Sequence, residues 1–121
     1  MFRLLVSGSR EWDQEHVLQM MIAQFWVRYG DDLIVVHGDC PRGADRMARE
    51  FCERHGIKQE KYPADWNRHG KAAGHIRNKV MVDTKPDFAV FFIRGESRGT
   101  KNCLEHVKKA GIPHATYGDR P

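Results

Sequence analysis

Residues 33–56 read LIVVHGDCPRGADRMAREFCERHG and divide into an apolar run, a loop with two glycines, and an amphipathic segment. The β-branched run at 33–36 is typical of a strand that is covered on both faces. From Ala44 to Gly56 the apolar residues recur at helical spacing, which predicts a helix. The loop between these elements contains an arginine and an aspartate, and a second aspartate opens the helix. Open α/β sheets place their ligands at such carboxyl ends of strands.

The rest of the chain alternates in the same way. Further strands are predicted at 2–6, 57–62, 88–93 and 113–117, and further helices at 13–29, 72–83 and 100–110. The run at 88–93 is the most apolar and predicts a central strand, whereas 57–62 alternates in polarity and predicts an edge strand. Residues 64–71 lack an apolar period and are interpreted as an ordered loop, and residues 118–121 are expected to fray. This alternation predicts a mostly parallel sheet of about five strands with helices on both faces.

Two of the predicted helices carry more surface of one kind than packing on the sheet explains. The helix at 13–29 carries an apolar stripe wider than one sheet contact needs, so a homodimer interface is predicted there. In the helix at 72–83, Ala73, Ile76 and Val80 share one face and are interpreted as the packing face. Another face carries Gly74, Arg77, Asn78 and Met81, and we interpret Arg77 and Asn78 on it as functional because packing does not require that face.

Composition limits the function classes. The 121 residues are 40% hydrophobic, which is enough for one domain over residues 1–121 without metal or disulfide support. The three cysteines form no C-x-x-C pair, and no apolar N-terminal run is long enough for a signal peptide or a membrane span, so we expect a cytoplasmic protein with no membrane partner. No G-x-G-x-x-G or Walker motif and no paired zinc spacing occurs, so no cofactor and no metal is predicted. The net charge of +4 favours an anionic partner or reflects a basic surface.

Three strand-to-helix junctions contain glycines beside polar residues, at 8–10, 38–45 and 95–100. In a parallel sheet they lie along one edge. Free backbone amides and the positive ends of helices at such loops bind phosphate, and Arg10, Arg42 and Arg98 add positive charge. Each loop alone would do no more than turn the chain. Together with Arg77 and Asn78, the three predict an anion-binding site.

The ordered motifs resemble the small stand-alone SLOG proteins of the YspA-like group. The motifs are Gly8-Ser9-Arg10, His37-Gly38 with Gly43-Ala44-Asp45, Asp65-Trp66, Arg77-Asn78 with Met81, and Ser97-Arg98-Gly99-Thr100. This superfamily includes the DNA-processing protein DprA and the LOG phosphoribohydrolases, so the resemblance implies a Rossmann-like three-layer domain that binds a nucleotide-derived small molecule. The residues it assigns to ligand binding, with those from the loop analysis, are Gly8, Ser9, Arg10, His37, Gly38, Asp39, Arg42, Gly43, Ala44, Asp45, Asp65, Trp66, Gly74, Arg77, Asn78, Ser97, Arg98, Gly99 and Thr100.

One departure from the LOG pattern concerns catalysis. LOG enzymes carry Pro-Gly-Gly-x-Gly-Thr-x-x-Glu, whereas residues 95–103 read GESRGTKNC, so a cysteine replaces the closing glutamate. Cleavage of an N-glycosidic bond ordinarily requires carboxylates. Arg77 matches the arginine that the LOG pattern places in this helix. If the protein is an enzyme, the resemblance implies that Arg77 is catalytic and that Asp39, Asp45, Asp65 or Glu96 supplies the missing carboxylate. Ser97 also adds a side chain where glycine would let the backbone approach a phosphate.

Three functions remain open: a nucleotide-binding module, a nucleoside-monophosphate phosphoribohydrolase, and DprA-like nucleic-acid binding. The last is disfavoured because no Lys/Arg stripe is interleaved with aromatic residues. Trp12 and Trp66 either stack on a base or pack over the core. Cys52 and Cys103 fall on apolar stripes and are interpreted as core residues, while Cys40 is expected to be exposed.

Overall fold

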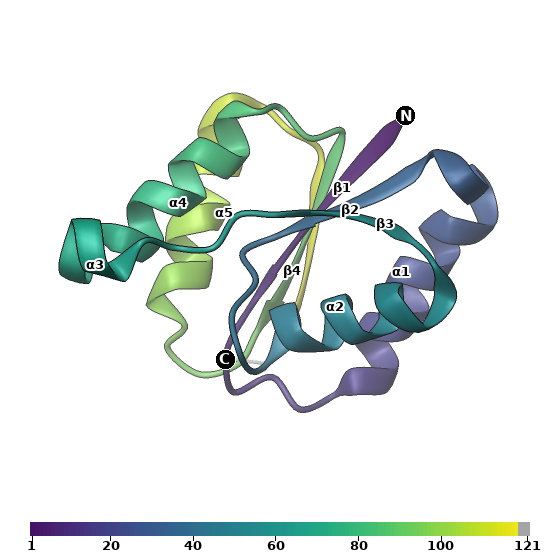
Figure 1. Cartoon of the computed structure of the whole chain (residues 1–121), viewed down its shortest axis with the longest axis horizontal. Coiled ribbons are helices and arrows are strands. Elements are labelled where there is room, and N and C mark those ends of the chain that lie inside the picture. The colour runs from purple at the N-terminus through teal and green to yellow at the C-terminus, as the bar shows by residue number, and fades with distance from the viewer. Residues whose placement is uncertain (119–121) are drawn as a thin grey trace.

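The computed structural model describes residues 1–118 and contains a five-stranded sheet between two helical layers (Figure 1). The strands are β1 (Phe2–Gly8), β2 (Leu33–His37), β3 (Lys58–Lys61), β4 (Phe88–Ile93) and β5 (His114–Gly118). Their order is β3-β2-β1-β4-β5, and every neighbouring pair is parallel. This arrangement confirms the predicted Rossmann-like α/β fold.

The helices divide between the two faces of the sheet (Figure 1). On one face lie α1 (Glu15–Tyr29) and α2 (Ala44–His55); on the other lie α3 (Trp66–His69), α4 (Ala73–Asp83) and α5 (Arg98–Ala110). Short 3-10 turns at Gly30–Asp32 and Gly70–Ala72 complete the elements. None of the helices within residues 1–118 combines the length and apolarity that a membrane crossing needs.

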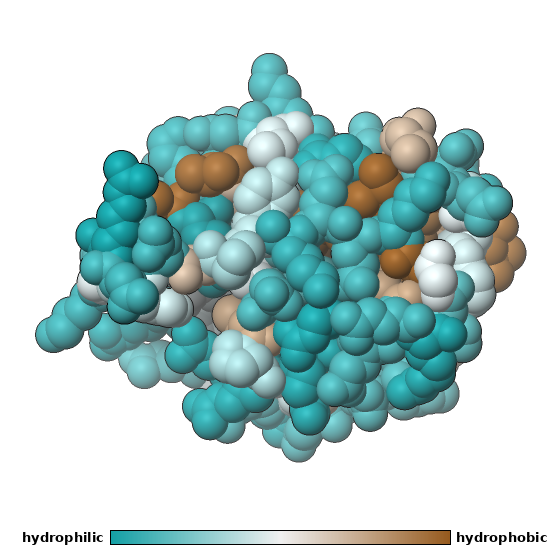
Figure 2. Space-filling view, viewed as in Figure 1, coloured by the Kyte–Doolittle hydropathy of each residue, from teal (hydrophilic) through white to brown (hydrophobic). Residues whose placement is uncertain are grey.

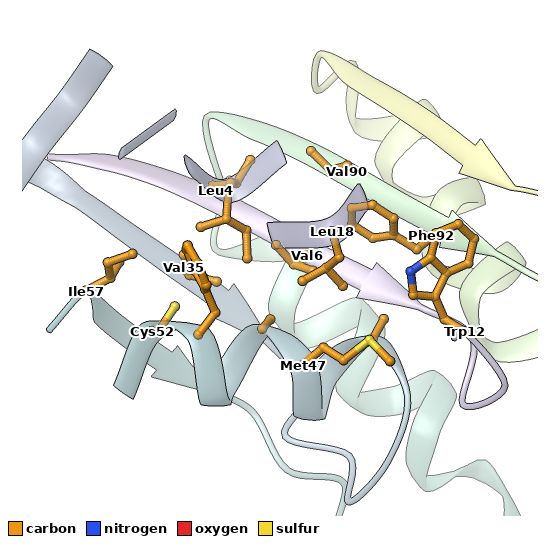
Figure 3. Packing of buried hydrophobic residues seen from close by; sticks show 14 of the residues in the cluster. Leu4, Val6, Trp12, Leu18, Val35, Met47, Cys52, Ile57, Val90 and Phe92 are labelled. Atoms are coloured by element: carbon orange, nitrogen blue, oxygen red, sulfur yellow. The ribbon is translucent and has the colours of Figure 1, made fainter. Parts of the chain in front are cut away.

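The central strands are buried on both faces because consecutive apolar side chains point to opposite sides of the sheet. Leu4, Val6 and Phe92 pack under α1 and α2, where Figure 3 shows Phe92 beside Trp12 and Val6 beside Leu18. Leu5 and Phe91, their neighbours in sequence, pack under α4 and α5. By contrast, β3 has no fully buried residue. The predicted central strand at 88–93 and the predicted edge strand at 57–62 are therefore both confirmed.

The strand order creates a switch point between β1 and β4. From β1 the chain proceeds outward through β2 and β3, then crosses back to place β4 on the other side of β1. The loops after β1 and β4 consequently lead to helices on opposite faces of the sheet (Figure 1). Ligands in open α/β sheets bind in the crevice that such diverging loops leave.

Three local predictions are wrong. Residues 66–69 form the short helix α3 rather than a loop, because the carboxylate of Asp65 accepts a hydrogen bond from the Arg68 backbone N–H at 3.1 Å and caps a single turn. In α4 the predicted packing face is reversed beyond Ala73: Ile76 and Val80 are 39% and 50% exposed, because Met81 and its neighbours pack on the core instead. Finally, Gly118 belongs to β5; residues 119–121 lie outside the described residues.

Most of the wide stripe on α1 packs within its own fold. Leu18 and Ile22 are fully buried, and the ring of Phe2 stacks on Tyr29 with centroids 3.9 Å apart. Met20 and Val27 remain exposed. On the face drawn in Figure 2, apolar side chains appear as separate patches within a polar surface. Core packing therefore accounts for much of the stripe, and the homodimer stays a prediction.

Arg3 in β1 joins three parts of the fold. Its guanidinium contacts both carboxylate oxygens of Glu60 in β3, at 2.7 and 3.0 Å, and donates to the carbonyl and hydroxyl oxygens of Thr84 at 3.0 and 2.9 Å. Its backbone N–H also donates to Asp87 at 2.8 Å. The hydrogen bonds from Arg3 hold the pKa of Glu60 below its ordinary value.

Replacing Glu60 with glutamine is therefore expected to cost more stability at pH 7 than at pH 3. A carboxylate whose folded pKa is depressed stabilises the fold above its unfolded pKa of about 4.3, and this contribution is lost as the pH falls through the folded pKa. Urea unfolding of the wild type and Glu60→Gln at both pH values measures the effect, with the exposed Glu105→Gln as control. An equal loss at both pH values would contradict this assignment.

Candidate functional site

The loops that follow β1, β2 and β4 surround a hollow of about 700 Å³ at the switch point. Residues 6–11 form one wall, residues 94–100 form another, and α3 and α4 close a third side. The three glycine-containing junctions thus meet at one place. A hollow of this size falls within the range of small-molecule sites in proteins.

Most of the predicted ligand-binding residues line this hollow. They are Gly8, Ser9, Arg10, Gly38, Arg42, Asp45, Trp66, Gly74, Arg77, Asn78, Ser97, Arg98, Gly99 and Thr100. The hollow does not include His37, Asp39, Gly43, Ala44 or Asp65. It does include residues outside the predicted binding set, among them Val6, Ser7, Glu11, Cys40, Lys71, His75, Arg94 and Gly95. Cys40 and Gly95 lie within the predicted junctions, and Ser7, Glu11 and His75 adjoin predicted residues in sequence, which is the signal that could have found them.

The predicted residues that lie outside the hollow have structural contacts that explain their positions. His37 is fully buried, and its Nδ1 accepts a hydrogen bond from the Asp39 backbone N–H at 3.0 Å. The ring proton is therefore on Nε2, which lies 2.8 Å from the side-chain oxygen of Gln59. Asp39 pairs with Arg49 at 2.9 Å. Asp65 caps α3 and lines a smaller hollow of about 270 Å³ instead.

Gly43 and Ala44 bring the loops after β1 and β2 into contact. The Ala44 backbone N–H donates to the Ser9 carbonyl at 3.2 Å. Gly43 adopts φ +75° and ψ −145°, a conformation that in practice only glycine reaches. A side chain there would also overlap the Ser9 carbonyl and the Arg10 backbone. These two residues shape the hollow without lining it.

Arg77 links α4 to two other segments. Its Nη1 donates to the carbonyl oxygens of Gly38 and Tyr62 at 2.6 and 3.2 Å, and its Nε donates to Asn78 at 2.9 Å. Gly38 permits this approach because a Cβ at that position would overlap the guanidinium. The interpretation that packing does not need this face is therefore wrong: Arg77 holds the loop after β2 in place. Its Nη2 lies 3.9 Å from the Cys40 sulfur on the wall of the hollow.

The first turn of α5 faces the hollow, and no side chain within the described residues 1–118 caps it. The amide of Asn78 holds this turn in place by donating to the Gly99 carbonyl at 3.0 Å and to Asn102 at 3.2 Å. Ser97 has a positive φ of 44°, and its hydroxyl donates to the Arg94 carbonyl at 2.6 Å. Because that hydroxyl turns back along the chain, it does not occupy the capping position. The backbone amides of the turn are thus oriented as an anion-binding helix terminus requires.

Positive side chains outnumber negative ones around the hollow. Among residues 1–118, six Arg or Lys residues line it, against three Asp or Glu residues: Arg10, Arg42, Lys71, Arg77, Arg94 and Arg98 against Glu11, Asp45 and Glu96. Arg94 also pairs with Asp13 at 3.1 Å. Two of the three carboxylates contact exposed arginines, in the pairs Arg42–Glu11 at 3.1 Å and Arg98–Glu96 at 3.6 Å. The excess of positive charge favours an anionic ligand.

The acidic candidates for catalysis differ in position. Asp45 is 6% exposed, lines the hollow, and accepts a hydrogen bond from the Cys40 backbone N–H at 3.2 Å. Glu96, by contrast, lies on the exposed rim, while Asp39 and Asp65 lie outside the hollow. Asp45 is thus the one inward-facing carboxylate among the four.

The cysteine thiols are poorly suited to nucleophilic or metal chemistry. Burial, reinforced by the negative charge of Asp45, raises the pKa of Cys40 above its ordinary value, so this thiol is protonated at neutral pH. Burial raises the pKa of Cys52 and of Cys103 to about 12, in keeping with their place in the core. In the part of the chain that the structure describes, no three His, Cys, Asp or Glu side chains gather closely enough to hold a metal ion.

Comparison with known proteins identifies the family. The model of the YspA, cpYpsA-related SLOG family matches residues 2–69. The chain belongs to this SLOG family. Over 126 aligned residues that span both proteins completely, it is 38% identical to the gene 61 protein of Mycobacterium phage D29. The crystal structure of the C-terminal domain of the PF1911 hydrogenase from Pyrococcus furiosus is similar in fold alone, with a TM-score of 0.50 and 19% identity over 95% of this chain and 90% of that one.

The family match covers only part of the hollow in this SLOG protein. Residues 2–69 include the loops after β1 and β2 and Trp66. Arg77, Asn78 and the first turn of α5 lie beyond the match, so their place in the site rests on geometry.

Proposed function

We propose that this SLOG protein binds a nucleotide or a nucleotide-derived ligand in the hollow at the switch point. The observation that carries the proposal is that, within residues 1–118, positive side chains outnumber negative ones around a hollow that also receives the first turn of α5, which no side chain of these residues caps. Helix N-termini and arginine clusters are both well suited to bind phosphate. Membership of the SLOG family supports a nucleotide rather than another phosphorylated compound.

The contacts suggest how a phosphate is held. The amides of Gly99 and Thr100 donate to phosphate oxygens, and Asn78 keeps that turn in register through its bond to the Gly99 carbonyl. Arg77 is fixed through Nη1 and Nε, and its Nη2, which makes a long contact of 3.9 Å to the Cys40 sulfur, is a donor on the wall of the hollow that can turn to the ligand. Because these donors are held in place before the ligand arrives, little conformational entropy is lost on binding.

Calorimetric titration with AMP, ADP, ADP-ribose and cyclic AMP tests this proposal, with inorganic phosphate as the minimal anion. We expect saturable heat with at least one nucleotide, and weaker binding of phosphate alone. Absence of binding across the panel would contradict the proposed function.

A second candidate function is hydrolysis of the N-glycosidic bond of a nucleoside monophosphate. The position of Asp45 favours it, because a buried carboxylate inside the hollow is suited to activate a water or stabilise a cationic sugar. The same carboxylate also accepts the Cys40 N–H, which fixes its orientation.

If the wild type releases free base from AMP, the Asp45→Asn variant is expected to release it at least about a hundredfold more slowly. Chromatography of the reaction mixture measures the base. Asp39→Asn is the matched control, because Asp39 pairs with Arg49 outside the hollow. Equal rates in wild type and Asp45→Asn would exclude this role, and no release by the wild type would exclude the hydrolase and leave the binding function.

A further inference from the structure

Trp66 differs from the other two tryptophans in that folding does not explain its position. Trp12 is 5% exposed, packs on Phe92, and donates its indole N–H to the Gln14 carbonyl at 3.0 Å. Trp26 packs on the His55 ring at 5.2 Å. Trp66 is 50% exposed and lines the hollow, and its indole N–H makes no hydrogen bond within residues 1–118. The alternative that Trp66 packs over the core is therefore wrong.

The surroundings of Trp66 hold its ring at the wall of the hollow. Asp65 caps the turn that carries it. The ring edge lies 3.6 Å from the point where a Cβ of Gly74 would be, so the indole rests against the backbone of α4. On its face lies the guanidinium of Arg10, with Cζ 5.9 Å from the ring centre. The ring thus already receives one planar group.

We propose that Trp66 is the stacking platform for the base of the ligand, so that the site selects phosphates that carry a planar heteroaromatic base. This inference rests on the proposed function. The base takes the place of the Arg10 guanidinium on the ring, and the freed guanidinium turns to the phosphate. Stacking on tryptophan tolerates any base, because every base has a π face.

The position of Arg77 supports this orientation of the ligand. The Cη2 atom of Trp66 and the Nη2 atom of Arg77 lie 3.6 and 4.0 Å from the same point above Gly74. A base on the indole therefore has a cationic donor close beside it, on the side toward Gly38 and Asp45. A nucleoside phosphate would therefore be recognised at both ends, by stacking of its base on Trp66 and by donors to its phosphate around the hollow. A sugar phosphate without a base would leave the ring unused.

Calorimetry with AMP and with ribose 5-phosphate, on wild type and on Trp66→Leu, separates the contribution of the base to binding from that of the sugar phosphate. We expect Trp66→Leu to bind AMP about tenfold or more weakly and to bind ribose 5-phosphate as the wild type does. Trp66→Phe, which keeps an aromatic face, should retain most of the AMP affinity. Because Trp66 is half exposed on a one-turn helix, both variants are expected to fold, and circular dichroism checks this.

Two other results would overturn the inference in distinguishable ways. Equal AMP affinity in wild type and Trp66→Leu would reject the stacking role and leave the nucleotide site intact. If the wild type binds neither AMP nor ribose 5-phosphate, this result contradicts the proposed nucleotide binding, and the stacking role of Trp66 falls with it. Fluorescence gives an independent measurement: AMP should quench wild-type tryptophan emission, and Trp66→Phe should bind AMP without that quenching, because Trp12 and Trp26 pack within the fold.

Discussion

Replacing Gly43 with alanine should lower the free energy of unfolding by about 3 kcal/mol or more. Two costs add at this position. The backbone conformation, with φ +75° and ψ −145°, is strained for any residue with a side chain. The new Cβ would also overlap the Ser9 carbonyl and the Arg10 backbone, which are main-chain atoms and do not move aside as the end of a side chain would.

Urea unfolding measures this loss, and Gly99→Ala is the matched control. Gly99 lies in the first turn of α5, and nothing within 4 Å of its Cβ position obstructs an alanine. Because alanine favours a helix over glycine, Gly99→Ala should keep or raise stability by up to about 1 kcal/mol. A Gly43→Ala protein as stable as Gly99→Ala would show that the loops after β1 and β2 do not meet as described.

Replacing Arg77 with alanine should weaken AMP binding about a hundredfold and also lower the free energy of unfolding by about 2 kcal/mol. The binding loss follows from the removal of a fixed cationic donor on the wall of the hollow. The loss of stability follows because the carbonyl oxygens of Gly38 and Tyr62 each lose a charged donor.

Two variants separate the roles of charge and geometry at Arg77. Arg77→Lys keeps the charge but lacks the fork of donors that reaches both carbonyls, so it should recover only part of the affinity. Arg28→Ala removes a positive charge from the last turn of α1, remote from the hollow, and should bind AMP as the wild type does. Equal losses in Arg77→Ala and Arg28→Ala would mean that net charge alone controls binding.

The convergence of the three loops could be predicted from the sequence because it depends on strong local signals. The apolar runs at 2–6, 33–36 and 88–93 fix three parallel strands, and parallel strands carry their following loops to one edge. The same logic predicts that Gly38, Arg98 and Thr100 lie around one site, and all three line the hollow.

The positions of individual side chains depend on tertiary contacts that periodicity does not contain. In α4 two faces fit a helical spacing, and the pattern does not reveal that Asn78 and Met81 face inward while Ile76 and Val80 face outward. Near Gly38, Asp39 has a positive φ of 55°, and its carboxylate pairs with Arg49 at 2.9 Å outside the hollow. Arg49 lies more than one turn into α2, and no local sequence motif predicts that it pairs with Asp39.

A titration followed by proton–nitrogen correlation spectra tests the central claim most directly, because it reports both whether a nucleotide binds and where. The probes are AMP, ADP and ADP-ribose, added to the uniformly nitrogen-labelled protein. We predict saturable shifts that are largest at the amides of Asp45, Gly99 and Thr100 and in the indole signal of Trp66, with the amides of α1 unchanged. Spectra that stay constant with all three probes, or shifts that gather on α1 instead of around the hollow, would contradict it.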